Sequence, residues 1–363
     1  MVSPFEVLCG CCSPCGFWFD GVRISINGKS YLVTTLLREG ELTALYQVKC
    51  PKRSHSGGVY ALKKVTCPIG RADFVTRAMT EISNYQRFNS PYITNILDFQ
   101  VAQHDNGTKI IYMLLPYFPA GSLQDLINNM IIRGDSLSES RVVRLMLDIC
   151  RGVRCMHEPS ESDFRDPYDV AYFDAASLRY SDETHLLVDA MELDLLSPPL
   201  TNSEPSAYVH CGLNPENIML SSEGLPVIYN MASCVRAPLE LTSNSKLLGL
   251  QEWLNENSCL PYTCPELLDL HPNTSITNRC DIWSLGCICY ALMYSISSFA
   301  REQQLCGTPI KHSISTGNFS FPDEPRYSQS LKRIVQRCLV IDPHKRPDIY
   351  ETLAQFQELL DTS

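Results

Sequence analysis

The sequence predicts an α+β fold of two lobes: a small lobe built on an antiparallel sheet over residues 21–117 and a larger helical lobe over residues 118–363. Three observations lead to this prediction. The 363 residues, 44% hydrophobic and 19% charged, are typical of a globular chain with a sizeable buried core. The first lobe is rich in alternating, strand-like patterns, and the second in apolar residues at helical spacing. Residues 1–20 are expected to form a separate head.

The small lobe begins with a predicted hairpin. Two alternating segments, 22–28 and 30–37, are joined by the dipeptide Asn27-Gly28, which favours a two-residue turn. A helix is predicted around 71–89, because four residues there recur at helical spacing: Phe74, Ala78, Ile82 and Tyr85.

The helical lobe is interrupted by a proline-rich segment. A predicted helix at 142–157 carries apolar residues along one broad face. Residues 158–207 then hold five prolines and no regular pattern, which is typical of a mobile insertion. Leu187, Met191 and Leu195 recur every four residues within it. They indicate either an acidic amphipathic helix that docks on a protein partner or a solvated linker with incidental leucines.

The net charge is concentrated in that segment. The whole chain carries −10, and residues 158–208 alone hold twelve acidic residues against two basic ones, Arg165 and Arg179. The rest of the chain is therefore neutral in sum. A net negative charge argues against nucleic-acid binding.

Cysteine is abundant, with 17 residues in the chain. The N-terminus lacks the pattern of a secretory signal, so we expect a reducing, cytosolic compartment and mostly free thiols. No apolar segment is long enough to span a bilayer, since the best candidate, 282–299, contains four serines and a glycine.

Four cysteines of the head are predicted to carry acyl chains: Cys9, Cys11, Cys12 and Cys15. Aromatic residues flank them, and two or more thioester-linked chains give stable anchoring at about 0.8 kcal/mol per buried CH₂. Val2 after the initiator methionine excludes N-myristoylation. The alternatives are a zinc knot and a plain disordered tail, and cysteines this close together are poorly placed to surround one ion.

Eight short segments stand in a characteristic order along the chain: 60–63, Glu81, 115–123, 210–217, 230–232, 264–266, 281–286 and 342–347. In this order they resemble the signature segments of the protein kinase superfamily. The resemblance implies a bilobal protein-kinase-like fold, with ATP and Mg²⁺ as the cofactors of the family.

Shorter matches narrow the resemblance. Segments 63–65, 88–91, 114–116 and 250–253 are similar to the Numb-associated kinase family, and within it to the lipid-anchored serine/threonine kinase branch with palmitoylated fungal vacuolar members. This resemblance implies peripheral attachment to the cytosolic face of an intracellular membrane (vacuole, Golgi or endosome) through the acylated cysteines. It leaves the protein partner unknown.

By this resemblance, nine residues line the nucleotide site: Leu37, Gly40, Leu45, Ala61, Lys63, Glu81, Leu115, Tyr117 and Met219. Lys63 and Glu81 either fix the phosphates as an ion pair or only brace a helix, and Leu115 is the gatekeeper. Only Gly40 remains of three glycine positions in the glycine-rich loop, and Glu41 adds a carboxylate that repels phosphate. The loop is either a weakened phosphate loop or a surface hairpin without a ligand.

The residues that carry the family's chemistry are changed. Gly212 stands where the family has the aspartate that accepts the hydroxyl proton, and Asn214 where it has a lysine that neutralises the phosphoryl group. Asn230 replaces the magnesium-binding aspartate, so that with Asn217 two neutral amides form a poor metal site. Loss of a positioned acid–base group alone costs about 10²–10⁴ in rate.

Residues that brace the fold are retained. His210, Glu266, Asp281 and Arg346 match scaffold positions of the family, and Glu266 with Arg346 is expected to form a buried ion pair. Cys211 replaces the arginine that binds an activation-loop phosphate, so switching by such a phosphate is not expected.

Three functions follow from these observations. We favour a membrane-tethered pseudokinase that acts as a scaffold or allosteric partner, with at most weak ATP binding and no productive Mg²⁺ site. The alternative is a residual ATP-dependent serine/threonine kinase that uses relocated carboxylates, of which Glu216 is the nearest. Metal or redox sensing is the third, and it is disfavoured because the cysteines outside the head are scattered along the sequence.

Overall fold

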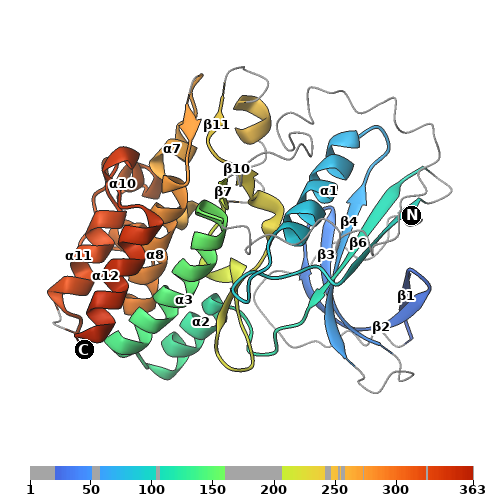
Figure 1. Ribbon diagram of the computed structural model, residues 1–363, viewed down its shortest axis with the longest axis horizontal. Helices are drawn as coiled ribbons and strands as arrows, with labels where there is room; N and C mark the ends of the chain where they lie inside the picture. The colour runs from blue at the N-terminus through green and yellow to red at the C-terminus, as the bar shows by residue number, and fades with distance from the viewer. Residues whose placement is uncertain are drawn as a thin grey trace. The chain divides into compact units, whose positions relative to one another are not determined.

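A computed structural model describes residues 21–50, 58–103, 107–159, 207–241, 247–251, 254, 258–272, 274–323 and 326–362. The predicted head, with Cys9, Cys11, Cys12 and Cys15, and all but the ends of the predicted insertion at 158–207 lie outside these residues. The chain divides into two compact units (Figure 1). The described residues of 21–70 and 97–117 are called the sheet unit, and those of 71–96 and 118–362 the helical unit.

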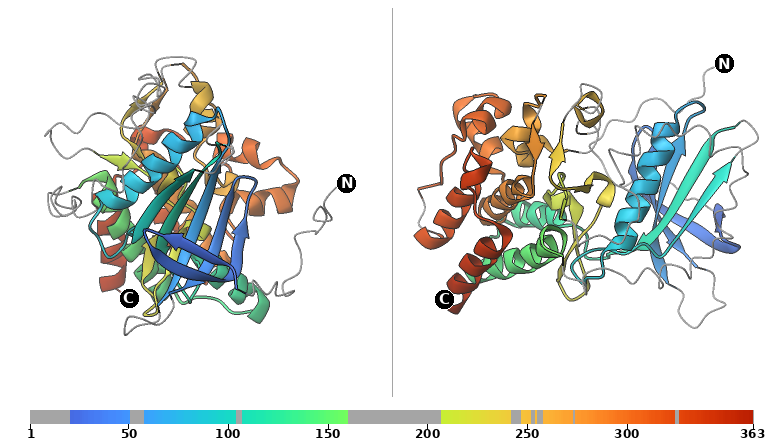
Figure 2. Two further views of the ribbon diagram at one scale, coloured as in Figure 1. Left: turned by 90° about the vertical axis from the view of Figure 1, so that its right-hand side faces the viewer. Right: turned by 45° about the horizontal axis from the view of Figure 1, so that its top comes forward.

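The sheet unit is a six-stranded antiparallel sheet in the order β1-β2-β3-β4-β6-β5, and its twist is visible in Figure 2. Its strands are β1 (Arg23–Ile26), β2 (Lys29–Glu39), β3 (Thr43–Lys49), β4 (Val59–Cys67), β5 (Asp98–Gln103) and β6 (Lys109–Pro116). The predicted hairpin is confirmed. Ile26 pairs with Lys29, and Asn27 and Gly28 have φ angles of 46° and 78°, as a two-residue turn of this kind requires.

One face of this sheet carries the apolar core of the unit. Its buried members are Ile26, Tyr31, Val33, Val48, Leu62 and Leu114. Leu62 on β4 pairs directly with Leu114 on β6, so the two side chains stand side by side on that face. Successive side chains of a strand point to opposite faces, and therefore Ala61 and Lys63 lie on the other face of the sheet.

The helical unit contains the α-helices α1 (Ala72–Arg87), α2 (Leu123–Arg133), α3 (Glu139–His157), α7 (Pro265–Leu268), α8 (Arg279–Tyr294), α9 (Ser298–Cys306), α10 (Ile310–Thr316), α11 (Gln329–Cys338) and α12 (Ile349–Asp361). Its short strands form three antiparallel pairs: β7 (Tyr208–Val209) with β10 (Val235–Arg236), β8 (Ile218–Leu220) with β9 (Pro226–Ile228), and β11 (Leu239–Glu240) with β12 (Ser275–Ile276). Single 3₁₀ turns are η4 (Pro215–Asn217), η5 (Met231–Ser233), η6 (Leu260–Tyr262) and η7 (Pro343–Lys345).

Helix α8 is the central helix of this unit. Its residues from Cys280 to Met293 are all buried, so it is apolar on every side rather than amphipathic. Helices α3 and α11 pack against it, and Trp283 stacks on Phe299 of α9 with ring centroids 5.3 Å apart. In Figure 1, α3 and α11 accordingly lie beside α8.

The length and apolar character of α8 also bear on membrane insertion. Among the residues that the structure describes, no single helix is long and apolar enough to cross a bilayer. The pair α8 and α9, bent by 64°, meets the criterion only by combined length and composition. The burial of α8 inside the unit accounts for that composition.

Helix α1 confirms the helix predicted around 71–89. It belongs to the helical unit, whereas the predicted small lobe 21–117 grouped it with the sheet. The reason lies in its contacts. The buried Asn84 donates hydrogen bonds to the carbonyl oxygens of Met231 (3.1 Å) and Cys234 (2.8 Å), and α1 packs on η5. Phe88, at its C-terminal end, meets Tyr208 edge to face.

Helix α3 confirms the helix predicted at 142–157 and begins three residues earlier. Ser138 is the N-cap, and its side chain accepts a hydrogen bond from the backbone N–H of Arg141. The last residue of the helix, His157, is buried and brings an imidazole to the start of the loop at 210–217.

Candidate functional site

One buried carboxylate, that of Asp281, holds the start of the loop at 210–217. Asp281, wholly buried in the first turn of α8, accepts the backbone N–H of His210 at 2.8 Å and that of Cys211 at 3.0 Å. The Nε2–H of His157 donates to the same carboxylate at 2.9 Å. Three donors therefore solvate the buried negative charge and fix the start of the loop. His157 was not selected from the sequence, although a histidine on the apolar side of a helix end is a signal for such a role.

His210 joins this loop to the segment after β9. Its Nδ1 accepts the N–H of Gly212 at 3.2 Å and lies 3.2 Å from the Oγ of Ser233, while its Nε2 faces the carbonyl oxygen of Tyr229 at 3.4 Å. Burial lowers the pKa of His210 below its ordinary value. The ring is therefore neutral at physiological pH, with its proton on Nε2, and it acts as a hydrogen-bonding brace.

Gly212, at the position expected for the catalytic base, offers only backbone groups. Its carbonyl oxygen accepts hydrogen bonds from the side-chain amides of Asn217 (2.8 Å) and Asn214 (3.2 Å). The absence of a side chain removes a proton acceptor at this position, and the carbonyl is already engaged in holding the loop.

Asn214, at the position expected for the loop lysine, is a helix cap. Its Oδ1 accepts the N–H groups of Glu216 (2.8 Å) and Asn217 (3.2 Å) at the start of η4, and the residue is only 5% exposed. The sequence predicted a lost charge here. The structure adds that the amide is fully used inside the loop, in the manner of an N-cap.

The two residues expected to hold a metal bind each other. The Nδ2 of Asn230 donates to the Oδ1 of Asn217 at 3.2 Å, and the Nδ2 of Asn217 is spent on Gly212. Asn230 has a left-handed backbone (φ 63°), which asparagine tolerates better than most residues. Mg²⁺ prefers charged oxygens in an octahedral set. A neutral amide pair in which one N–H faces the other oxygen does not fit Mg²⁺.

Two of the residues predicted to line the nucleotide site lie in the helical unit. The first, Met219, is on β8 and forms a backbone bridge with Ser122. Glu81 is buried on α1, also in the helical unit. Burial raises the pKa of Tyr85 well above its ordinary value, and the nearby Glu81 carboxylate raises it further. Glu81 thus lies in the interior of the unit, near Tyr85.

The sheet unit gathers four candidates on one face. Lys63 pairs with Leu45 on β3, and Ala61 pairs with Leu115 on β6, so these four residues share the face opposite the apolar core. The other two strand-end candidates are Leu37, exposed on β2, and Tyr117, which follows β6.

The degraded glycine-rich loop is the turn between β2 and β3. The N–H of Gly40 donates to the carbonyl oxygen of Thr43 at 2.7 Å, and Glu39 pairs with Ala44. A Cβ on Gly40 would lie 2.9 Å from the Oγ1 of Thr43, so the threonine closes over the glycine. The amide of the one retained glycine is therefore committed to the turn.

The ion pair predicted between Glu266 and Arg346 is present and bidentate. Nη1 of Arg346 donates to Oε1 at 2.5 Å and Nη2 to Oε2 at 2.8 Å. Nε of the same guanidinium donates to the carbonyl oxygen of Val340 at 2.7 Å, and the group lies over the ring of Trp283. Arg346 is buried, and this geometry joins α7 to the segment that follows α11.

The fold and these loops define a protein kinase domain. The chain matches the family described as "Protein kinase domain" over residues 31–166 and 206–356, and it therefore belongs to that family. The predicted α+β fold and the superfamily resemblance are confirmed. The unmatched stretch between the two segments falls inside the predicted insertion at 158–207.

Several curated proteins are similar over almost their whole length. Serine/threonine-protein kinase ENV7 of Saccharomyces cerevisiae is 41% identical over 365 residues, covering 98% of this chain and 97% of the relative. Serine/threonine-protein kinase ppk13 of Schizosaccharomyces pombe is 28% identical, and human serine/threonine-protein kinase 16 is 26% identical; each comparison covers 93% of this chain and 92% of the relative.

Proposed function

We propose that this protein is a pseudokinase, tethered to a membrane, that works as a scaffold or allosteric partner and not by transferring phosphate. The observation that carries the proposal is the hydrogen bond between Asn230 and Asn217, which pairs two neutral amides where the family holds its metal. Gly212 and Asn214 add a missing base and a missing cation in the same loop.

The three changes affect one reaction step. Phosphoryl transfer depends on positioning and on neutralising charge, so loss of the metal ligand, the base and the lysine is cumulative. The base alone accounts for about 10²–10⁴ in rate. The rest of the chain keeps the kinase fold but lacks these three catalytic groups. This combination suits a protein that acts by binding a partner.

Membrane attachment is the second part of the proposal. It rests on Cys9, Cys11, Cys12 and Cys15 in the head and on the resemblance to the lipid-anchored branch of the Numb-associated kinases. The site of action proposed is the cytosolic face of the vacuole, Golgi or endosome, in membrane traffic. The partner is a protein of unknown identity, and nucleic acid is not expected.

The names of the relatives, all serine/threonine kinases, favour residual kinase activity as the alternative. Glu216 would then be the substitute carboxylate. It is exposed in η4, and it contributes to the raised pKa of Tyr262, which is caused chiefly by burial. The Glu216 carboxylate therefore lies near Tyr262, in the segment that precedes α7. Residual kinase activity would require the same carboxylate to accept the hydroxyl proton at the loop 210–217.

Phosphorylation by the purified full chain with radiolabelled ATP and Mg²⁺ tests the choice. We expect no labelling of the chain or of a protein substrate above that of a Lys63→Met variant. The triple change Gly212→Asp, Asn214→Lys and Asn230→Asp should raise labelling, provided that its thermal unfolding shows a folded protein. Labelling by the unaltered chain that disappears in Lys63→Met would establish the kinase and remove the pseudokinase.

The anchor is tested by fractionation of cells. A variant with all four head cysteines changed to serine should move from the membrane fraction to the soluble fraction. Cys306→Ser, which changes an exposed cysteine of α9, is the matched control and should leave the distribution unaltered. Membrane association that survives the fourfold change would show that acylation is not the anchor.

A further inference from the structure

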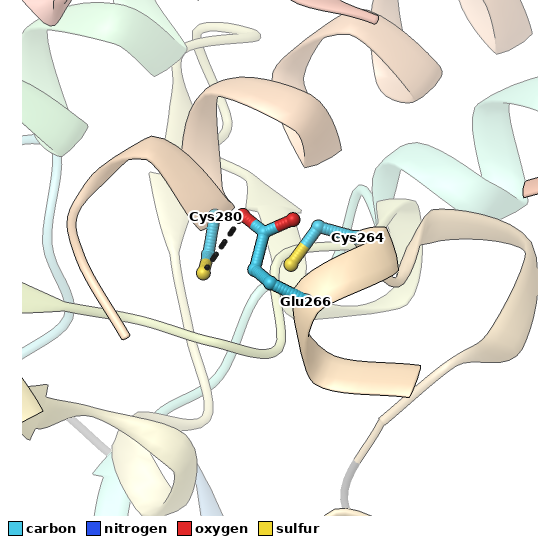
Figure 3. A group of neighbouring side chains, drawn as sticks. All are labelled: Cys264, Glu266 and Cys280. Carbon is cyan, nitrogen blue, oxygen red and sulfur yellow. Dashed lines mark hydrogen bonds between the residues drawn. The ribbon is translucent and has the colours of Figure 1, made fainter. Parts of the chain in front are cut away.

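Two buried cysteines and a glutamate meet at the junction of α7 and α8, away from the loop at 210–217. Cys264 precedes α7, Glu266 lies in its first turn, and Cys280 lies in the first turn of α8. The two sulfur atoms and a carboxylate oxygen are all within 4.8 Å of one another. Figure 3 shows the three side chains pointing toward one another. These residues are called the thiol–carboxylate cluster.

One proton of the cluster lies between two of its donor atoms. The thiol of Cys280 donates to Oε1 of Glu266 at 3.3 Å, the contact dashed in Figure 3. Cys264 is 0% and Cys280 1% exposed, and both are free cysteines. The cluster therefore exists as two thiols and one carboxylate, turned inward.

We infer that the thiol–carboxylate cluster is a binding site for one thiophilic divalent cation of the Zn²⁺ or Cd²⁺ type, which replaces the two thiol protons. Thiolate sulfur and carboxylate oxygen are the ligands that such ions take in proteins. Zn–S bonds of about 2.3 Å in a tetrahedral arrangement require sulfur atoms roughly 3.8 Å apart, so the donor atoms need to approach by no more than about 1 Å.

Exchange of the two thiol protons for one divalent cation leaves the total charge of the cluster unchanged. This balance matters because an uncompensated buried charge would be strongly destabilising. Two S–H groups and M²⁺ give two metal-bound thiolates and two released protons, so the net charge of the buried region is unchanged. Glu266 keeps its partner, because the cation takes the place of the Cys280 proton on Oε1 while Arg346 stays bound through both guanidinium nitrogens. The positive Arg346 in turn offsets the extra negative charge of the ligand set.

A bound cation would connect α7 with α8, and we expect it to stabilise the helical unit.

Cadmium alone is the probe, because its bonds to thiolate give an ultraviolet charge-transfer absorption. The full chain is used with Cys9, Cys11, Cys12 and Cys15 changed to serine, so that the head contributes no thiol. We expect one Cd²⁺ per chain, two protons released for each ion, and competition by Zn²⁺. Cys264→Ser and Cys280→Ser should each weaken binding at least tenfold. Cys289→Ser, which changes another buried cysteine of α8, is the control and should bind as the parent does.

Alkylation provides a readout that does not depend on the folding of the variants. In the parent, Cd²⁺ should protect Cys264 and Cys280 from alkylation in mild denaturant, as mapped by mass spectrometry, and leave Cys289 unprotected. Absence of bound cadmium, protection that maps to other cysteines, or binding that is equal in Cys264→Ser and the parent would each overturn the assignment. The result is independent of whether the protein transfers phosphate.

Discussion

Two polar networks in the helical unit are both largely buried but are built from different groups. Around the loop at 210–217, the side chains of Asn214, Asn217 and Asn230 bind one another and the backbone as neutral amides. Between α7 and η7, Glu266 and Arg346 carry full charges in a bidentate pair. The comparison teaches that charge is kept at this ion pair of the fold and is missing at three positions, Gly212, Asn214 and Asn230, where the family uses it for phosphoryl transfer.

The energetic reason for this difference is the cost of breaking each network. Removing one member of a buried ion pair leaves the other charge without a counter-ion, which costs several kcal/mol. Removing one neutral amide leaves at most an unsatisfied dipole, which costs about 1–3 kcal/mol. We therefore expect the fold to tolerate replacement of the loop amides better than replacement of either member of the ion pair.

The largest effect is expected at the ion pair. Arg346→Met should lower the free energy of unfolding by about 3–5 kcal/mol, because it leaves the Glu266 carboxylate, whose side chain is only 13% exposed, without its counter-ion beside two thiols. Urea denaturation followed by circular dichroism measures this change. Lys345→Ala, which removes an exposed charge paired with Asp342, is the control, at about 0.5 kcal/mol or less. Equal losses in the two variants would erase the distinction between the networks.

A smaller loss is expected at the carboxylate that supports the loop. Asp281→Asn replaces an acceptor of three hydrogen bonds by a group that presents N–H to a donor, and should cost about 2–3 kcal/mol. The same denaturation experiment measures it. Asp148→Asn, in a surface ion pair with Arg151, is the matched control. A loss below about 1 kcal/mol would mean that the loop does not depend on this charge.

Asn214 tests the loop network itself. Asn214→Ala removes the oxygen that caps η4 and should cost about 1 kcal/mol, well below the cost at Arg346. Glu223→Ala, at an exposed position in the turn between β8 and β9, is expected to change stability by less than about 0.5 kcal/mol. If Asn214→Ala destabilised the protein as much as Arg346→Met, the neutral network would be as necessary to the fold as the charged one.

The smallest effect is a dependence on pH. The pKa of His210 is lowered by burial below the ordinary 6.5, so the unfolded chain binds a proton that the folded chain does not. Stability should therefore fall as the pH drops below about 6.5, and it is fully present above it. His210→Gln should flatten this part of the curve of unfolding free energy against pH. An unchanged slope in the variant would show that His210 is not the group that titrates.

Much of the fold follows from local patterns in the sequence. The turn at Asn27-Gly28 and the helix ending at His157 were predicted because each depends on neighbouring residues, whereas the kinase fold was predicted from a resemblance in the order of eight segments. The grouping of α1 with the helical unit was not predicted, since it results from contacts of Asn84 with carbonyls about 150 residues away. Pairings at such separations are decided by packing and leave no periodic signal.

The same limit applies to side-chain partners in the candidate sites. His157 reaches Asp281 over 124 residues, and Asn230 reaches Asn217 across the β8–β9 hairpin. Cysteines that look scattered in the sequence meet when Cys264 and Cys280 come together beside Glu266. The interpretation of the cysteines outside the head as scattered is therefore wrong for this pair, because α7 and α8 bring their ends together.

The sequence by itself determined which groups this protein has at its loop: no side chain at Gly212, and amides in place of charges at Asn214 and Asn230. Only the tertiary structure decided what those groups do, namely that one amide caps η4 and the other closes on Asn217. The physical reason is that composition fixes charge and hydrogen-bonding capacity residue by residue, whereas a hydrogen bond needs two groups at about 3 Å, and packing sets that distance.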